Sequence, residues 1–207
     1  MSKSICLIQT GIGSSSAFAD LCAEIMPDIH AYQIIDDSLL PEIIKAGGLT
    51  TQARQRMFAY YQQAESLGVS AIVHTCVVAG DFAYEAQPFF NTPIVRIDEG
   101  MARAALDFAS RIAIVGTTPG SIEPSCSLFR SIATQRNQEI SLEQLVLSCP
   151  SNADAVMAEI GDIATKVDAI ALAQPSMTGL EPIVKSAGVP VLTVPRLGFE
   201  FIRTMLA

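Results

Sequence analysis

A cysteine and a glutamine occupy matching places in two similar stretches of this sequence. Residues 69–80 read VSAIVHTCVVAG and residues 167–179 read VDAIALAQPSMTG, so Cys76 corresponds to Gln174, 98 residues further along the chain. Each stretch begins with a short apolar run that is typical of a buried parallel strand. An ionised thiol at the end of such a strand can take a proton from a bound substrate, whereas an amide can only form hydrogen bonds. We therefore predict a site with one acid/base group and one pocket-lining amide.

Turns rich in glycine, serine and threonine follow two other predicted strands. Residues 4–8 lead into QTGIGSSS at 9–16, and residues 111–115 lead into GTTPGS at 116–121. Glycines let a ligand approach the backbone, and the start of the following helix offers free N–H groups to an anion. These turns are candidate carboxylate sites, although a simple tight turn would explain the glycines equally well. The first is not a good dinucleotide fingerprint, because Ser16 stands where the third glycine should be.

Predicted strands and helices alternate along the whole chain, which favours parallel sheets. Residues 139–146 could form either a helix or a strand. The other expected strands lie at residues 4–8, 31–35, 69–73, 92–97, 111–115, 167–171 and 189–193. The expected helices lie at residues 17–25, 39–46, 51–67, 82–90, 98–110, from about 123, 153–165, 179–186 and 197–206, and Thr50 is the expected N-cap of the third.

Segments of the two halves match in the same order, at offsets of 97 to 107 residues. We therefore predict an α/β fold of two similar lobes, each a parallel sheet flanked by helices, related by pseudo-two-fold symmetry with a cleft between them. The first lobe would hold residues 1–98 plus 196–207, and the second would hold residues 99–195.

Composition excludes several classes of protein. The 207 residues are 50% hydrophobic and carry a net charge of −8, which makes nucleic acid an unsuitable partner because phosphate binding needs a basic face. No apolar run approaches the roughly 18 residues of a membrane span, and the N-terminal apolar run is too short for a signal peptide. The five cysteines form no CxxC pair, so neither zinc nor a disulfide framework is indicated. We expect a cytoplasmic protein without a metal site.

The ordered set of motifs resembles the cofactor-independent aspartate/glutamate racemase superfamily, which also includes hydantoin racemases, maleate isomerases and arylmalonate decarboxylases. The motifs are IQTGIGS at 8–14, HTC at 74–76, TTPGS at 117–121 and LAQPSM at 172–177, and the resemblance covers nearly the whole chain. It implies a small carboxylate or amino-acid-like ligand and no cofactor, and we also expect a homodimer. It further implies two cysteines, one per lobe, that remove and return a proton on opposite faces of the substrate α-carbon.

Only the first of those two cysteines has a counterpart here. Cys76 takes the first position, while Gln174 stands at the second and Ser176 replaces the histidine that follows it in glutamate racemases. Gln9 stands where the family has an acidic residue, and Val77 and Val78 replace a common Asn-Thr pair. With Cys76 as the catalytic residue, the candidate substrate-binding residues are Gln9, Thr10, Thr75, Val77, Thr117, Thr118, Ser121, Gln174 and Ser176.

Two other charged or titratable residues lie near these motifs. His74, two residues before Cys76, could tune the thiol or could be a structural histidine. Arg96 is interpreted as a surface charge rather than as a clamp for the substrate. The sequence predicts an isomerase that acts at the α-carbon of a small carboxylate or amino-acid-like compound through one cysteine. The alternatives are a one-thiol decarboxylase and a non-catalytic protein that binds small carboxylates.

Overall fold

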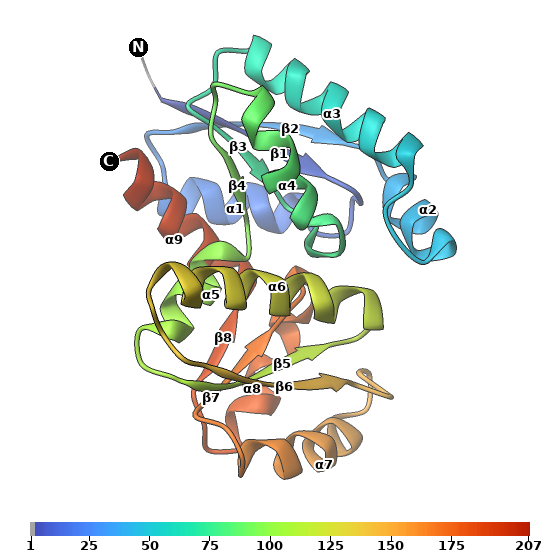
Figure 1. Ribbon diagram of the computed structural model, residues 1–207, viewed down its shortest axis with the longest axis vertical. Coiled ribbons are helices and arrows are strands. Elements are labelled where there is room, and N and C mark those ends of the chain that lie inside the picture. The colour runs from blue at the N-terminus through green and yellow to red at the C-terminus, as the bar shows by residue number, and fades with distance from the viewer. Residues whose placement is uncertain (1–2) are drawn as a thin grey trace. The chain divides into compact units, whose positions relative to one another are not determined.

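The computed structural model describes residues 3–207, and contacts between residues divide the chain into two compact α/β units (Figure 1). The first unit holds the chain up to Ile97 together with Gly198–Ala207, and the second holds Asp98–Leu197. Each unit contains one four-stranded sheet with helices on its faces. The two-lobed α/β fold that the alternation of strands and helices predicts is therefore confirmed.

All four strands of the first unit run parallel, in the order β2-β1-β3-β4. They are β1 (Ser4–Gln9), β2 (His30–Ile35), β3 (Ala71–His74) and β4 (Ile94–Arg96). β1 and β3 form the centre of the sheet and are buried on both faces, as their unbroken apolar runs require. Ile8 pairs with His74, so the carboxyl ends of the two central strands lie side by side. Polar residues that follow these strands are therefore brought together at one edge of the sheet.

Helices cover both faces of this sheet, as Figure 1 shows. One face carries α2 (Leu39–Ala46), α3 (Thr51–Ser66) and α4 (Asp81–Ala86), which share an apolar core with Cys6 and Ile8 of β1. The opposite face carries α1 (Ser15–Ile25) and the end of α9 (Val194–Leu206), where the rings of Phe18 and Phe199 meet edge to face at 5.9 Å. Side chains alternate along a strand, so Gln9 lies on the α1 face, opposite Cys6 and Ile8.

The second unit repeats this arrangement, with strand order β6-β5-β7-β8 and every neighbouring pair parallel. Its strands are β5 (Arg111–Gly116), β6 (Ser141–Val146), β7 (Ala169–Leu172) and β8 (Val191–Thr193). Its helices are α5 (Glu99–Leu106), α6 (Pro119–Gln135), α7 (Ala153–Ala164) and α8 (Glu181–Lys185). Val156, Ile160 and Val184 of α7 and α8 pack with Val115 and Leu172 in one apolar core. Among residues 3–207, no helix is both long enough and apolar enough to cross a membrane.

Several elements differ from the sequence prediction in their bounds. The ambiguous stretch 139–146 forms the edge strand β6, and Thr50 caps α3 as predicted, by accepting a hydrogen bond from the Ala53 backbone at 3.0 Å. The helix expected from about residue 123 begins earlier, at Pro119. Proline is well tolerated at the first helical position because the backbone N–H that it lacks would have no partner within the helix there. The expected helix 82–90 divides into α4 and the 3₁₀ turn η2 (Gln87–Phe89).

Candidate functional site

Buried polar residues gather at the carboxyl ends of β1 and β3. Gln9, Thr10, Thr75 and Cys76 are all at most 6% exposed, and Val77 beside them is also buried. Thr75 ties the two strand ends together, since its backbone N–H and its hydroxyl both donate to the carbonyl of Ile8, at 3.1 and 2.9 Å. All the site residues predicted in the first unit therefore lie at this one edge of the sheet.

Cys76 begins the short 3₁₀ turn η1 (Val77–Ala79) immediately after β3. Its carbonyl accepts a hydrogen bond from the Ala79 backbone at 3.2 Å, which closes the turn. Three of the other four cysteines are also buried, and Cys149 is exposed. Burial raises the pKa of Cys6 to about 11 and that of Cys22 to about 12, so these two thiols stay protonated near neutral pH.

His74 links Cys76 to Tyr61 of α3. Its Nε2 lies 2.9 Å from the carbonyl oxygen of Cys76, and its Nδ1 lies 2.7 Å from the Tyr61 hydroxyl. A carbonyl can only accept, so Nε2 donates to the Cys76 carbonyl. Burial raises the pKa of Tyr61, and a negative charge at Cys76 raises it further, so the phenol keeps its proton. His74 thus connects the Cys76 backbone to Tyr61, which favours the structural role.

Gln9 presents a buried acceptor to the same edge of the sheet. Its Nε2 donates to Gln33 of β2 at 2.7 Å, while its Oε1 is buried without a hydrogen-bond partner. All other buried side-chain oxygens and nitrogens of the described residues have a hydrogen-bond partner. Burying an unsatisfied amide oxygen costs about 1–3 kcal/mol. An arrangement of this kind fits a ligand that brings a hydrogen-bond donor to Gln9.

In the second unit, Gln174 and the TTPGS turn meet at the carboxyl ends of β5 and β7. The Gln174 Oε1 accepts from the backbone N–H of Thr117 at 2.7 Å and from its hydroxyl at 2.9 Å. This fixes the carbonyl side of the half-buried amide and leaves its N–H₂ side as the donor that a ligand could meet. Ser176 lies just beyond, exposed, in the 3₁₀ turn η3 (Pro175–Leu180). Gln174, Thr117 and the neighbouring turn therefore form one polar group.

Ser121 is buried within the TTPGS turn and stabilises it. It is fully buried, and its hydroxyl donates to the Thr118 carbonyl at 2.8 Å. A side chain at Gly116 would place its Cβ 2.5 Å from the Ser121 hydroxyl, so the turn needs glycine there. The half-buried Thr118 is the N-cap of α6, without a capping bond from its side chain. Thr118 is therefore better placed than Ser121 to meet a ligand.

The interpretation of Arg96 as a surface charge is wrong. Its side chain is 0% exposed, and its Nη1 pairs with Asp81 Oδ1 at 2.7 Å. Its guanidinium also lies 5.7 Å from the centre of the Tyr84 ring. One signal in the sequence could have shown this. Arg96 follows Ile94 with strand period two, so it shares the inward face on which Ile94 packs in the core.

Comparison with known proteins agrees with this architecture. A sequence model described as Asp/Glu/Hydantoin racemase matches residues 8–198. This chain belongs to the Asp/Glu/Hydantoin racemase family. A search of curated proteins gave no match.

Solved structures with the racemase-family fold cover almost all of this chain. A glutamate racemase from Bacillus anthracis is 17% identical, with a TM-score of 0.75 over 99% of this chain and 81% of its own. A putative Asp/Glu racemase from Yersinia pestis is 16% identical, with a TM-score of 0.75 over 98% of each chain. An allantoin racemase from Pseudomonas fluorescens is 15% identical, with a TM-score of 0.64 over 98% of this chain and 90% of its own. At these identities the likeness establishes the fold.

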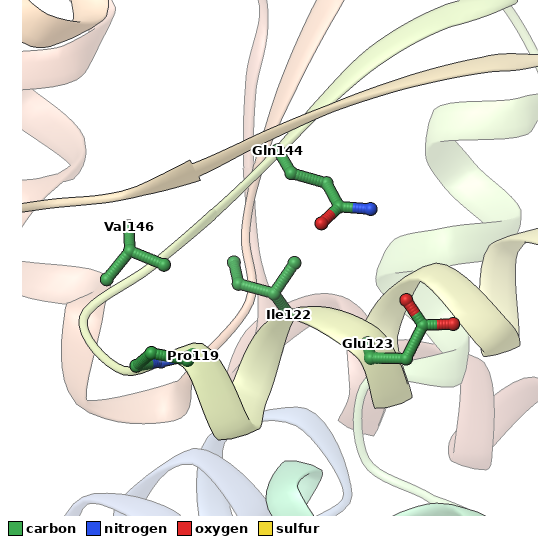
Figure 2. Close-up of a pocket in the computed structure, with 5 residues that line it drawn as sticks. All are labelled: Pro119, Ile122, Glu123, Gln144 and Val146. Atoms are coloured by element: carbon green, nitrogen blue, oxygen red, sulfur yellow. The ribbon is translucent and has the colours of Figure 1, made fainter.

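A further pocket on the racemase-family fold lies beside the TTPGS turn in the second unit. Figure 2 shows it between the first turns of α6 and the strand β6, with the polar ends of Glu123 and Gln144 on the same side of the pocket. Its remaining lining residues, Pro119, Ile122 and Val146, are apolar. The pocket contains none of the predicted site residues, and the negative charge of Glu123 makes it a poor receptor for a carboxylate.

Proposed function

We propose that this protein is a cofactor-independent isomerase that exchanges a proton at the α-carbon of a small carboxylate or amino-acid-like compound, with Cys76 as its acid/base. Membership of a racemase family supports the reaction class. The observation that carries the proposal is the edge of the first sheet, where Cys76 lies among buried polar residues and Gln9 holds a buried acceptor without a partner. Such groups at the carboxyl ends of central parallel strands are typical of ligand sites in α/β proteins.

The proposed reaction needs one proton transfer in each direction. The Cys76 thiolate takes the α-proton, so the C–H bond breaks, an S–H bond forms, and the electron pair moves into the neighbouring carboxylate as an enolate. To complete an isomerisation, a water molecule protonates the enolate on the face opposite Cys76, and the hydroxide that remains takes up the thiol proton through solvent. Hydrogen-bond donors must then stabilise the developing oxyanion. We assign that role to Thr10, Thr118 and nearby backbone N–H groups, and we assign substrate binding to Gln9, Thr75, Val77, Thr117, Gln174 and Ser176, while Ser121 shapes the turn.

The amide at Gln174 also favours a second candidate function, a one-thiol decarboxylase. An amide has no proton to give near neutral pH, so a reaction that needs protonation from one side only fits the residues well. In that reaction the bond between the α-carbon and a carboxyl group breaks, carbon dioxide leaves, and the Cys76 thiol protonates the resulting carbanion. A third possibility, a protein that only binds small carboxylates, would need no reaction at Cys76.

Hydrogen–deuterium exchange distinguishes these functions. A panel of amino acids, hydantoins and substituted malonates is incubated with the protein in heavy water and followed by proton NMR and chiral chromatography. We expect deuterium at the α-carbon of at least one compound, and we expect Cys76→Ala to abolish it. Cys149→Ala, which changes an exposed thiol in the other unit, serves as the matched control and should exchange at the wild-type rate.

Two other outcomes identify the alternatives. Release of carbon dioxide from a malonate, with one enantiomer as product, would establish the decarboxylase. A compound that raises the melting temperature of the wild type, while no compound exchanges or loses carbon dioxide, would refute the catalytic proposal in favour of the binder.

A further inference from the structure

Arg96 packs against the end of the turn that carries Cys76. A methyl group at Gly80 would collide with the Cζ, Nε and Nη2 atoms of Arg96, so the guanidinium lies directly against the backbone there. Gly80 ends the 3₁₀ turn that begins at Cys76, and its backbone N–H donates to the Val77 carbonyl at 3.0 Å. At the other end of the turn, His74 holds the Cys76 carbonyl. The turn is thus fixed at one end by His74 and at the other by Arg96.

We propose that Arg96 is the positioning residue of the Cys76 site: its buried guanidinium braces residues 76–80 and supplies positive charge that favours the thiolate. The inference rests on the proposed function, because it concerns the same thiol. It is tested on the thiol itself, without any substrate.

The charge balance around the turn supports this role. Arg96 is fully buried, whereas the side chain of its partner Asp81 is 48% exposed. Water therefore screens the charge of this carboxylate more than that of the guanidinium. The titratable groups near the turn and Arg96 include Tyr61 of α3, His74 of β3, and Asp81 and Tyr84 of α4, and the buried Asp98 follows Arg96 by two residues.

Tyr61 contributes no charge of its own. The phenol keeps its proton because burial raises the pKa of Tyr61. The pKa of Tyr61 is also lowered by the positive charge of Arg96 and raised by a negative charge at Cys76. Tyr61 therefore lies within electrostatic reach of both Cys76 and Arg96, and Arg96 is the cation of the three.

The experiment measures the pH at which Cys76 becomes reactive. Wild type and variants are labelled with iodoacetamide from pH 5 to 10, and mass spectrometry of the digested protein gives the labelling rate of each cysteine. Arg96→Met removes the charge and keeps an unbranched side chain, so the Cys76 midpoint should rise by about one pH unit or more. Arg96→Lys keeps the charge, so its Cys76 midpoint should lie closer to the wild-type value than to that of Arg96→Met. Asp81→Asn removes one negative charge beside the guanidinium and should lower the midpoint.

Two controls make the result specific. The exposed Cys149 is read in the same digests and should not change. Arg56→Met removes a partly exposed arginine of the same unit, which pairs with Glu42 at 3.1 Å, and it should leave the Cys76 midpoint at the wild-type value. A shift as large with Arg56→Met as with Arg96→Met would overturn the proposal.

An unchanged midpoint in Arg96→Met, or an upward shift in Asp81→Asn, would also overturn it. Asp81→Asn carries the test alone if Arg96→Met does not fold, because the Asp81 side chain is half exposed. The outcome is separate from that of the proposed function. Opposite shifts in the two variants would support the role of Arg96 even if no compound exchanges a proton.

Discussion

Replacing Gln9 with methionine should make the ligand-free protein more stable and the ligand-bound protein less so. Gln9 is 2% exposed, and its Oε1 is buried without a partner while its Nε2 donates to Gln33 at 2.7 Å. Methionine has a similar length and no amide, so it removes the unsatisfied oxygen and adapts to the space that remains. The same change deletes the acceptor that we assign to the ligand.

The size of the effect follows from two opposing contributions. Removing a buried acceptor that has no partner recovers about 1–3 kcal/mol of unfolding free energy, and losing the partly buried bond to Gln33 costs about 0.5–1.5 kcal/mol. The expected net gain is about 1 kcal/mol. For a chain of this size, that corresponds to a rise in the melting temperature of about 2–4 °C.

The assay is thermal and urea unfolding of the ligand-free protein, followed by circular dichroism. Gln33→Ala is the matched control, because it breaks the same hydrogen bond and leaves the Gln9 amide in place, so it should lower the melting temperature. A fall in the melting temperature of Gln9→Met by several degrees would refute the reasoning, because it would mean that the Gln9 oxygen already has a partner. A compound that stabilises the wild type should lose most of that effect in Gln9→Met.

Two further predictions concern stability. Tyr61→Phe removes the phenol that is bonded to the buried Nδ1 of His74, so urea unfolding should show a loss of about 1–3 kcal/mol in unfolding free energy. Tyr60→Phe removes a partly buried bond to Asp36 and should lower the unfolding free energy by less, and an equal loss would contradict the assignment. Arg111 holds the pKa of Asp168 at about 2, below its ordinary 3.8, so their pair stabilises the fold above about pH 4 and loses that effect as the pH falls toward 2. Asp168→Asn should therefore be less stable than wild type at pH 7, and urea unfolding should show this difference narrowing as the pH falls from about 4 toward 2; a constant difference across this range would contradict the linkage.

The parts of the fold that follow from the sequence are those set by local pattern. The largely apolar run at residues 69–73 predicts a buried strand because such residues must fill both faces of a parallel sheet. The polar cluster at the strand ends follows from the same rule, since parallel strands bring their carboxyl ends to one edge. Thr50 is recognisable as a cap because its bond reaches only three residues along the chain.

The contacts that define the site chemically are not local, which is why the sequence did not show them. The bond between Tyr61 and His74 joins residues 13 apart on different elements, and that between Thr117 and Gln174 joins residues 57 apart. The sequence interpretation put Arg96 at the surface because arginine is rarely fully buried. It gave the residue type more weight than the two-residue period of the strand, which puts Arg96 on the same face as Ile94. These features depend on contacts between side chains of different elements, and the packing of those elements determines which side chains come into contact.

The two units differ in what their matched strand ends can do, and this difference limits the chemistry. The first unit places a thiol after β3, on a turn that His74 contacts at one end and the buried Arg96 contacts at the other. The second places an amide after β7, whose oxygen is already bonded twice to Thr117. A hydrogen-bonded amide can orient a ligand but cannot exchange a proton with it near neutral pH. We therefore propose that Cys76 carries the proton transfer and that Gln174 takes no part in it. In the decarboxylation, a planar carbanion that receives its proton only from Cys76 gives a single enantiomer. An isomerisation instead needs a proton on the opposite face, and water must supply it because the Gln174 amide cannot.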